Sequence, residues 1–365
     1  MQHNTDKLRW GILGTAHIAR KNWKAIHHAG NGTVVAVASR DLEKARRFIA
    51  ECQAEAPMDK PPRALGSYEE LIAAPDVDAL YIPLPTGLRK EWILRAAAAG
   101  KHIVCEKPCA ISAPDLKEML KACRQNRVQF LDGVMFMHSQ RLSRMRGVLD
   151  DGESIGKIKH ITTSFSFPAP AEFFTGNIRV SSAMEPHGCL GDLGWYCIRF
   201  ALWVMRGQLP RQATGSFLGQ FTAPGSRTPV ATEFSGELFF DDGASSGFYC
   251  SFLTANEQCA TISGTKGYLR LSDFVLPVRG EEVMFEVNQT AHTARGVETR
   301  WHRIAIAEHS NDHPTAQETN LFRNFANQVR TGQLNESWME TASQTQSVQE
   351  ACFRSAQEGG RLVEL

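Results

Sequence analysis

Hydrophobic positions follow two alternating periodicities along the first 132 residues. Short runs rich in β-branched residues at 10–13, 34–38, 79–82 and 102–105 predict buried strands. Between them, apolar residues recur at helical spacing, and we expect helices at 18–28, 42–52, 89–99 and 112–126. The last of these begins with Ser112 and Asp115 in a capping-box pattern. This alternation predicts βαβ units and a doubly wound, parallel α/β sheet.

The pattern changes after residue 133. Helical periodicity covers 140–149 and 189–205, with a strand-like segment at 158–165 between them. From about residue 211 to 305, nearly every segment is typical of strand and turn, and helical periodicity returns at 320–330 and 343–358. With 365 residues, the chain is long enough for two domains. We expect one over 1–132 and an α+β domain over 133–365, which has an open, mostly antiparallel sheet and final helices able to pack back on the first domain.

Composition excludes several classes of protein. The 40 basic and 39 acidic side chains nearly cancel, so no nucleic-acid or anionic-membrane partner is expected. An apolar content of 42% argues against disorder, and no apolar run approaches the length of a membrane span. Residues 1–7 are polar and lack the apolar core of a secretory signal, so we expect a cytoplasmic protein.

The nine cysteines are scattered and never form a CxxC pair. Zinc and redox sites depend on such close pairs, so we expect no metal site. Reduced, mostly buried thiols also fit the reducing environment of the cytoplasm.

A degenerate glycine motif lies where the first predicted strand passes into the first predicted helix. In the pattern GxGxxG/A, Gly14 allows the tight turn, Ala16 stands at the second glycine and Ala19 at the third. A helix amino terminus at this place would bind the pyrophosphate of a dinucleotide. An ordinary strand-to-helix turn is the alternative. We predict cofactor contacts from Gly14, Thr15, Ala16, His17 and Ile18.

The end of the second predicted strand favours NADP(H) over NAD(H). NAD enzymes usually place an acid there to bind the ribose 2′-hydroxyl, whereas this chain has Ser39 followed by Arg40. A hydroxyl and a guanidinium suit a 2′-phosphate. Asp41 keeps NAD(H) open, and a further alternative is that Arg40 and Asp41 simply open the next helix as solvated charges.

Three side chains are candidates for catalysis. Lys107 follows a predicted strand at the carboxyl edge of the parallel sheet, where ligands bind in such folds. Asp192 and Tyr196 are four residues apart on one face of a predicted helix. The structural alternatives are a solvated lysine, a helix-capping aspartate and a core tyrosine.

Four segments in this order resemble the Gfo/Idh/MocA oxidoreductases. They are WGILGTA at 10–16, YIPLP at 81–85, EKP at 106–108 and DLGWY at 192–196. The resemblance extends to 177–179, 264–267 and the closing helix, and is strongest to the branch with dihydrodiol, aldose and glucose-fructose oxidoreductases. It implies a Rossmann NAD(P) domain and a second domain whose open sheet forms homodimers or homotetramers.

The resemblance also assigns roles to residues. Tyr196 matches the acid/base, Asp192 a carboxylate that orients the substrate, and Lys107 the lysine of the EKP motif. Further cofactor contacts are implied for Pro83, Leu84, Pro85, Glu106 and Lys107. Hydride transfer at a carbinol carbon requires an acid/base for the hydroxyl proton. A tyrosine ordinarily has a pKa of about 10, which a neighbouring ammonium would lower.

The chain departs from the family pattern at two places. Arg89 stands where relatives often have histidine, and residues 184–187 replace the usual glycine run before the catalytic helix. Arg179 and His187 are therefore candidate substrate contacts. The alternatives are a surface ion pair for Arg179 and a structural role for His187.

These observations predict an NADP(H)-dependent oxidoreductase. It would transfer a hydride between nicotinamide and a carbinol or carbonyl of a sugar or vicinal hydroxy compound. One alternative is a non-catalytic NAD(P)-binding regulator or scaffold. Another is a sugar-sugar oxidoreductase with non-dissociating NADP; its known examples carry a long amino-terminal arm, whereas only about seven residues precede the first predicted strand here.

Overall fold

The computed structural model describes residues 7–365, which form two compact units. One unit comprises the chain through Ser139 together with Asn311–Ser343, and the other comprises Gln140–Ser310 together with Gln344–Leu365. The last junction between the units falls inside a single long helix, α10 (Glu336–Gln357). The polar stretch on which the expected absence of a secretory signal depends, residues 1–6, lies outside the described residues.

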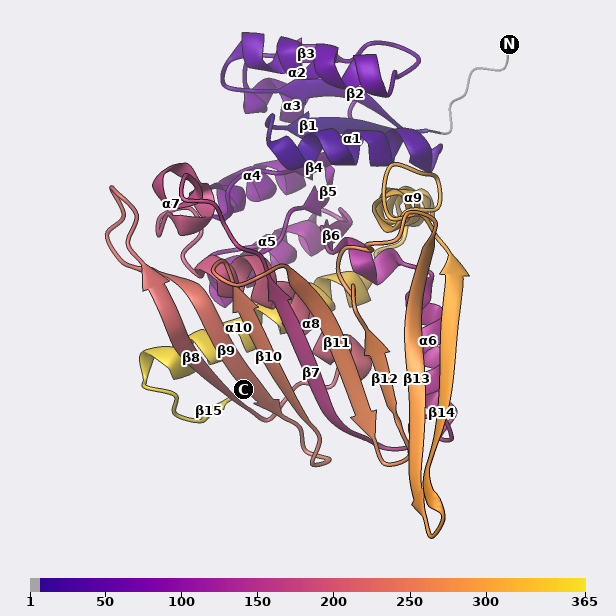
Figure 1. Ribbon diagram of the computed structural model, residues 1–365. Helices are drawn as coiled ribbons and strands as arrows, with labels where there is room; N and C mark the ends of the chain where they lie inside the picture. The colour runs from indigo at the N-terminus through magenta and orange to yellow at the C-terminus, as the bar shows by residue number, and fades with distance from the viewer. Residues whose placement is uncertain (1–6) are drawn as a thin grey trace. The chain divides into compact units, whose positions relative to one another are not determined.

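The first unit is built on a six-stranded parallel sheet in the order β3-β2-β1-β4-β5-β6 (Figure 1). Its strands are β1 (Leu8–Leu13), β2 (Gly32–Ala38), β3 (Arg63–Leu65), β4 (Ala79–Ile82), β5 (His102–Cys105) and β6 (Phe130–Asp132). The strand order reverses direction between β1 and β4. A reversal of this kind opens a crevice at the carboxyl ends of the two strands, where doubly wound folds bind their ligands.

Helices connect these strands as the apolar periodicity predicts. They are α1 (His17–Ala29), α2 (Leu42–Glu55), α3 (Tyr68–Ala73), α4 (Thr86–Ala98) and α5 (Ala113–Gln125). The predicted doubly wound α/β sheet is confirmed. The sequence missed the short elements β3 and α3 and placed the start of α4 three residues late, at Arg89 instead of Thr86.

The core of the first unit includes a helix from near the end of the chain. Helix α9 (Gln317–Arg330) packs on α1, and its Phe322 and Phe325 rings lie 5.2 and 5.3 Å from the buried Trp10 ring of β1. Both phenylalanines are almost fully buried in the same cluster as Trp23 and Tyr81. The short 3-10 turn η1 (Met135–His138) also packs against α9.

The second unit holds a nine-stranded sheet in the order β14-β13-β12-β11-β7-β10-β9-β8-β15. Its strands are β7 (Ile158–Ser166), β8 (Gln212–Phe221), β9 (Val230–Phe239), β10 (Ser245–Ser251), β11 (Glu257–Gly264), β12 (Tyr268–Leu271), β13 (Glu282–Thr293), β14 (Gly296–Ala307) and β15 (Val363–Glu364). Among the named strands of the described chain, β7 and β10 pair in parallel and all other neighbours are antiparallel, so the predicted mostly antiparallel sheet is confirmed.

The helical segments of this unit are α6 (Arg141–Asp150), α7 (Phe173–Gly176), the 3-10 turn η2 (Ile178–Val180), the π-helical turn η3 (Leu190–Gly194) and α8 (Trp195–Val204). Nearly every residue of α8 is buried because the helix is apolar on all sides. The predicted helix over 189–205 therefore exists, but its first part is wound as a π-helix instead of an α-helix. π-helical turns are frequently found at functional sites.

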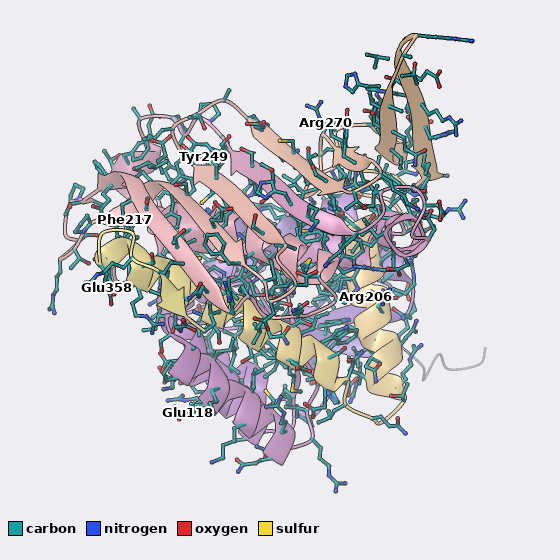
Figure 2. The ribbon with its side chains drawn as sticks, turned by 90° about the horizontal axis from the view of Figure 1, so that it is seen from below. Glu118, Arg206, Phe217, Tyr249, Arg270 and Glu358 are labelled. Carbon is teal, nitrogen blue, oxygen red and sulfur yellow. The ribbon has the colours of Figure 1, made fainter. Side chains whose placement is uncertain are left out.

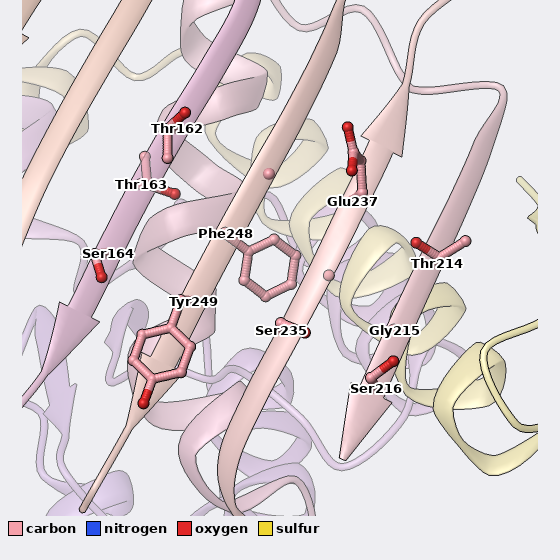
Figure 3. Close-up of a pocket in the computed structure, with 12 residues that line it drawn as sticks. Thr162, Thr163, Ser164, Thr214, Gly215, Ser216, Ser235, Glu237, Phe248 and Tyr249 are labelled. Atoms are coloured by element: carbon pink, nitrogen blue, oxygen red, sulfur yellow. The ribbon is translucent and has the colours of Figure 1, made fainter. Parts of the chain in front are cut away.

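One face of the second unit's sheet carries polar side chains, with short ones such as Thr162 and Ser164 beside longer ones such as Tyr249. Figure 2 shows this face, with Tyr249 of β10 and Arg270 of β12 on it. A shallow hollow of about 400 Å³ lies across β7, β10, β9 and β8, and Figure 3 shows its lining, which includes Thr162, Ser164 and Ser216. Among residues 7–365, no helix combines the length and apolar character needed to cross a membrane.

Candidate active site

The turn after β1 requires glycine. Gly14 has a φ of +113°, a conformation that other residues rarely adopt, and its amide donates to the carbonyl of Ala38 at 2.9 Å. A Cβ added to Gly14 would lie 3.1 Å from Leu84 Cδ2 and 3.8 Å from the Tyr68 hydroxyl. The backbone of the turn therefore lies close to the segment that follows β4, on the two strands that flank the crevice.

The two helices that begin at this crevice differ from the other crossover helices in how they are capped. Side chains of Asp41, Ser67 and Ser112 cap α2, α3 and α5 by accepting hydrogen bonds from first-turn amides. By contrast, the N-cap residues of α1 and α4 are Ala16 and Pro85, which provide no side-chain cap, and neither helix has an acidic residue in its first turn. Uncapped amino termini retain amides and positive dipole ends for an anion, so the residues present fit a dinucleotide pyrophosphate.

The end of β2 presents the groups on which cofactor choice depends. The Asp41 carboxylate is engaged as the cap of α2, because it accepts from the amides of Glu43 and Lys44 at 2.9 and 3.3 Å. Ser39 is buried and Arg40 is exposed. Burial raises the pKa of Tyr68, and the nearby Arg40 guanidinium opposes that rise, which places Arg40 close to the phenol beside Gly14.

The loop after β5 carries Lys107 between two anchored residues. The Glu106 carboxylate accepts from the Tyr81 hydroxyl at 2.6 Å and from Asn22 Nδ2 at 3.3 Å. Burial, and secondly the Glu106 charge, raise the pKa of Tyr81 well above its ordinary value, so Tyr81 stays a hydrogen-bond donor. Lys107 itself is half-buried, and the peptide bond to Pro108 is cis.

Arg89 takes a place that the sequence did not indicate. Its side chain is 4% exposed and donates to the carbonyl of Leu84 from Nε at 2.6 Å and to that of Glu106 from Nη1 at 2.7 Å. Nη1 also donates to the carbonyl of Pro108. Asn22 and Tyr81 were missed as well, because only the folded sheet brings α1 and β4 to Glu106.

The second unit brings Asp192 and Arg179 together. Arg179 Nε lies 2.7 Å from Asp192 Oδ2, and the Asn177 side chain orients η2 by accepting from the Arg179 amide at 3.0 Å. The Asp192 carboxylate raises the pKa of Arg179, and Glu185 and Tyr196 add to the rise. The ion-pair alternative weighed for Arg179 is therefore observed, with Asp192 of the candidate site as its partner.

Tyr196 is the second residue of α8, which follows the π-helical turn that carries Asp192. Its side chain is 6% exposed, and the Phe165 ring packs edge-on against it at 5.6 Å. The contribution of Tyr196 to the pKa of Arg179 places the phenol near the guanidinium. Arg179, Asp192 and Tyr196 thus form one polar group, in which the arginine is partly exposed and the tyrosine is buried.

His187 lies in the interior of the second unit. Its ring is 6% exposed, packs edge-on against Phe353 at 4.8 Å, and has no hydrogen-bond partner for Nδ1 among the described residues. Burial lowers the pKa of His187 to about 4, so the imidazole is neutral near pH 7. This packing matches the structural alternative considered for His187, and a contact with substrate stays a prediction.

Family comparisons cover most of the chain. Residues 8–133 match the model of an oxidoreductase family with an NAD-binding Rossmann fold, and residues 142–270 match the GFO/IDH/MocA C-terminal domain.

Two relatives show the range of similarity. The trans-1,2-dihydrobenzene-1,2-diol dehydrogenase of Homo sapiens is 30% identical over 270 residues, which cover 72% of this chain and 74% of that one. The dTDP-3,4-didehydro-2,6-dideoxy-alpha-D-glucose 3-reductase of Saccharopolyspora spinosa is 36% identical over 203 residues, 55% of this chain and 57% of that one.

Solved structures share the fold at lower identity. A 3-ketoreductase from Actinomadura kijaniata in complex with NADP and TDP-benzene superposes with a TM-score of 0.78 and 24% identity, over 96% of this chain and 98% of that one. An aldose-aldose oxidoreductase from Caulobacter crescentus superposes with a TM-score of 0.79 and 22% identity, over 98% of this chain and 100% of that one.

Proposed function

This chain belongs to the Gfo/Idh/MocA family and is a dehydrogenase or reductase with an NAD(P)-binding Rossmann domain; from this we propose that it depends on NADP(H). Its substrate would be a sugar or another vicinal hydroxy compound. The observation that carries the proposal is the crevice of the first unit. There the uncapped amino termini of α1 and α4 flank the strand reversal, and the loop after β5 supplies Lys107.

The preference for NADP(H) rests on three side chains at the end of β2. Asp41 is the acid that could bind a ribose 2′-hydroxyl, and its carboxylate is already engaged in capping α2. Ser39 and the exposed Arg40 offer a hydroxyl and a guanidinium, which suit a 2′-phosphate. The Actinomadura kijaniata ketoreductase, which shares the fold, was solved with NADP.

Tyr196 would be the acid/base of the reaction. Bound NADP(H) supplies or accepts the hydride. In oxidation, Tyr196 would accept the proton of the substrate hydroxyl, and in reduction it would donate a proton to the carbonyl oxygen. This role needs a phenol pKa below its ordinary value of about 10, and the cations Lys107 and Arg179 would stabilise the phenolate.

Asp192 would orient the substrate. Its carboxylate has more than one acceptor site, so it can hold the Arg179 guanidinium and also accept from a substrate hydroxyl. A substrate with two neighbouring hydroxyls could then reach Tyr196 with one and Asp192 with the other. The names of the relatives, a diol dehydrogenase and a sugar 3-reductase, support this substrate class.

A spectrophotometric screen tests the proposal. Aldoses, inositols and cyclic diols, with their keto forms, are offered with NADP(H) and with NAD(H) to wild type, Lys107→Ala and the control Lys117→Ala, which changes an exposed lysine of α5. We expect turnover of at least one compound, a loss of about 100-fold or more in Lys107→Ala, and no change in the control. Cofactor binding without turnover across the panel would favour a regulator or scaffold.

Cofactor choice has a separate test. Arg40→Ala should weaken NADP(H) binding about tenfold or more and leave NAD(H) binding within about twofold, because a charged hydrogen bond to phosphate is worth roughly 1.5–3 kcal/mol. Lys44→Ala, on the exposed side of α2, is the matched control. Equal weakening of both cofactors by Arg40→Ala would contradict a phosphate contact.

We also propose a homodimer or homotetramer formed through the outer face of the nine-stranded sheet. The short side chains of Thr162, Ser164, Ser216 and Ser235 line the shallow hollow on this face, so a second copy could approach the strands closely there (Figure 3). Sedimentation velocity should give an oligomer for wild type and a smaller species for Ser235→Arg. A monomeric wild type would contradict the proposal.

A further inference from the structure

Arg89 joins the two loops that follow the neighbouring strands β4 and β5. One loop, between β4 and α4, contains Leu84, whose carbonyl accepts from Arg89 Nε at 2.6 Å. The other, after β5, contains Glu106 and Pro108, whose carbonyls both accept from Arg89 Nη1. A single buried guanidinium therefore fixes how these two loops lie relative to each other.

The carbonyls that Arg89 binds belong to residues beside Lys107 and beside the Gly14 turn. Glu106 and Pro108 flank Lys107 directly, so the backbone of Lys107 is held on both sides. Leu84 is the residue whose side chain lies against Gly14, 3.1 Å from where a Cβ would be. Arg89 thus ties the loop of the candidate lysine to the loop beside the glycine turn.

The chemistry of arginine suits this task. A guanidinium is planar, stays charged in proteins and donates in a fixed fork, so it sets the angles between its acceptors as well as their distances. Hydrogen bonds from a charged donor are roughly twice as strong as neutral ones. Lysine has three rotatable donors on one nitrogen and could not span carbonyls from two loops with the same geometry.

We propose that Arg89 is a positioning residue, which sets the place of the Lys107 ammonium relative to the cofactor-binding loop of Pro83, Leu84 and Pro85. This inference rests on the proposed function for its catalytic consequence, but not for its effect on the two loops. Removal of Arg89 lets the Lys107 loop shift. A displacement of about 1 Å costs on the order of 100-fold in the rate of a reaction that depends on alignment.

Lys101 provides a matched control in the same unit. It is a buried cation that also holds two main-chain carbonyls, those of Ala74 and Val77, at 2.7 and 2.8 Å. These carbonyls precede β4, and Lys101 precedes β5, so the group lies at the amino-terminal edge of the sheet. Lys101→Met therefore removes a buried cation that, like Arg89, binds main-chain carbonyls. It leaves the loops after β4 and β5 unchanged.

The experiment compares wild type, Arg89→Met, Arg89→Lys and Lys101→Met by hydrogen exchange, thermal melting, NADPH titration and steady-state kinetics over pH. We expect both methionine variants to melt at a lower temperature. Only Arg89→Met should speed amide exchange at 84–88 and 106–110, by about tenfold or more, and lower kcat about 100-fold with a smaller change in substrate KM. Arg89→Lys should lie between wild type and Arg89→Met.

A further readout separates positioning from stability. In Arg89→Met the apparent pKa of the acid/base in the rate profile should rise toward that of free tyrosine, because a displaced Lys107 would no longer stabilise the proposed phenolate. Equal kinetics in Arg89→Met and Lys101→Met, or unchanged exchange at 106–110, would overturn the inference. If wild type shows no turnover, the proposed function fails, and the exchange data still decide whether Arg89 locks the loops.

Discussion

Substituting Gly14 with alanine perturbs the cofactor turn at one atom. An L-residue at a φ of +113° is strained by about 1–3 kcal/mol, and the new Cβ lies only 3.1 Å from Leu84 Cδ2. Arg89 holds the Leu84 carbonyl, so the leucine side chain or the Gly14 turn must move instead of the loop. We expect a loss of about 2–3 kcal/mol in the free energy of unfolding.

Gly30→Ala is the control. Gly14 lies in the turn before α1, and Gly30 is the residue that follows the carboxyl end of α1. It also has a positive φ, +77°, but an added Cβ would meet no atom within 4 Å. Its cost should be about 1 kcal/mol, from conformation alone.

The assay combines urea denaturation with titration of NADPH by fluorescence. Gly14→Ala should bind NADPH about tenfold or more weakly than wild type, since the turn that places the first amides of α1 has moved, whereas Gly30→Ala should bind like wild type. If Gly14→Ala loses stability but binds NADPH as tightly as Gly30→Ala, the glycine turn does not cradle the cofactor.

Three other substitutions test the second unit. Burial lowers the pKa of His187 from 6.5 to about 4, so between these pH values the folded state binds fewer protons than the unfolded state. The free energy of unfolding should therefore fall as the pH drops from 6.5 toward 4, by about 3 kcal/mol at most. In His187→Gln, the dependence of the unfolding free energy on pH should be shallower. Asp273→Ala leaves the fully buried Arg141 without the carboxylate that lies 2.6 Å from its guanidinium, so urea denaturation should show a loss of about 3–5 kcal/mol in the free energy of unfolding. A loss below about 1 kcal/mol would contradict a stabilising role for this buried ion pair. Gly188→Ala would place a Cβ 2.1 Å from the Ala231 carbonyl oxygen at a φ of +53°, and we expect little folded protein by circular dichroism.

Elements with a strong local pattern were predictable from the sequence. The strands β1, β2, β4 and β5 follow from β-branched runs, and the Ser112 hydroxyl does cap α5 by accepting from the Asp115 amide at 3.3 Å. The Asp115 carboxylate, however, pairs with Lys90 at 2.6 Å instead of closing the capping box. The three-residue strand β3 was missed because such a short segment has no periodicity.

The candidate site was predictable where the chemistry is local. The glycine turn depends on consecutive residues, and Asp41 could be weighed as a cap or a ribose ligand because both roles are set within a few residues. The place of Arg89 could not be derived, since its acceptors Glu106 and Pro108 lie 17 and 19 residues away in a loop. The π-helical winding under Asp192 likewise depends on packing of η3 against β7, β9 and β10.

The central proposal is that Lys107 and Tyr196 both serve the same reaction, and a double-mutant cycle tests it most directly. Single-turnover hydride transfer is measured for wild type, Lys107→Ala, Tyr196→Phe and the double variant, with Lys117→Ala, at an exposed position of α5, as control. If the two groups act as a unit, each single change should cost about 100-fold or more and the double variant should be no slower than the slower single one. Losses that multiply in the double variant, or a Tyr196→Phe rate equal to that of Lys117→Ala, would contradict the account.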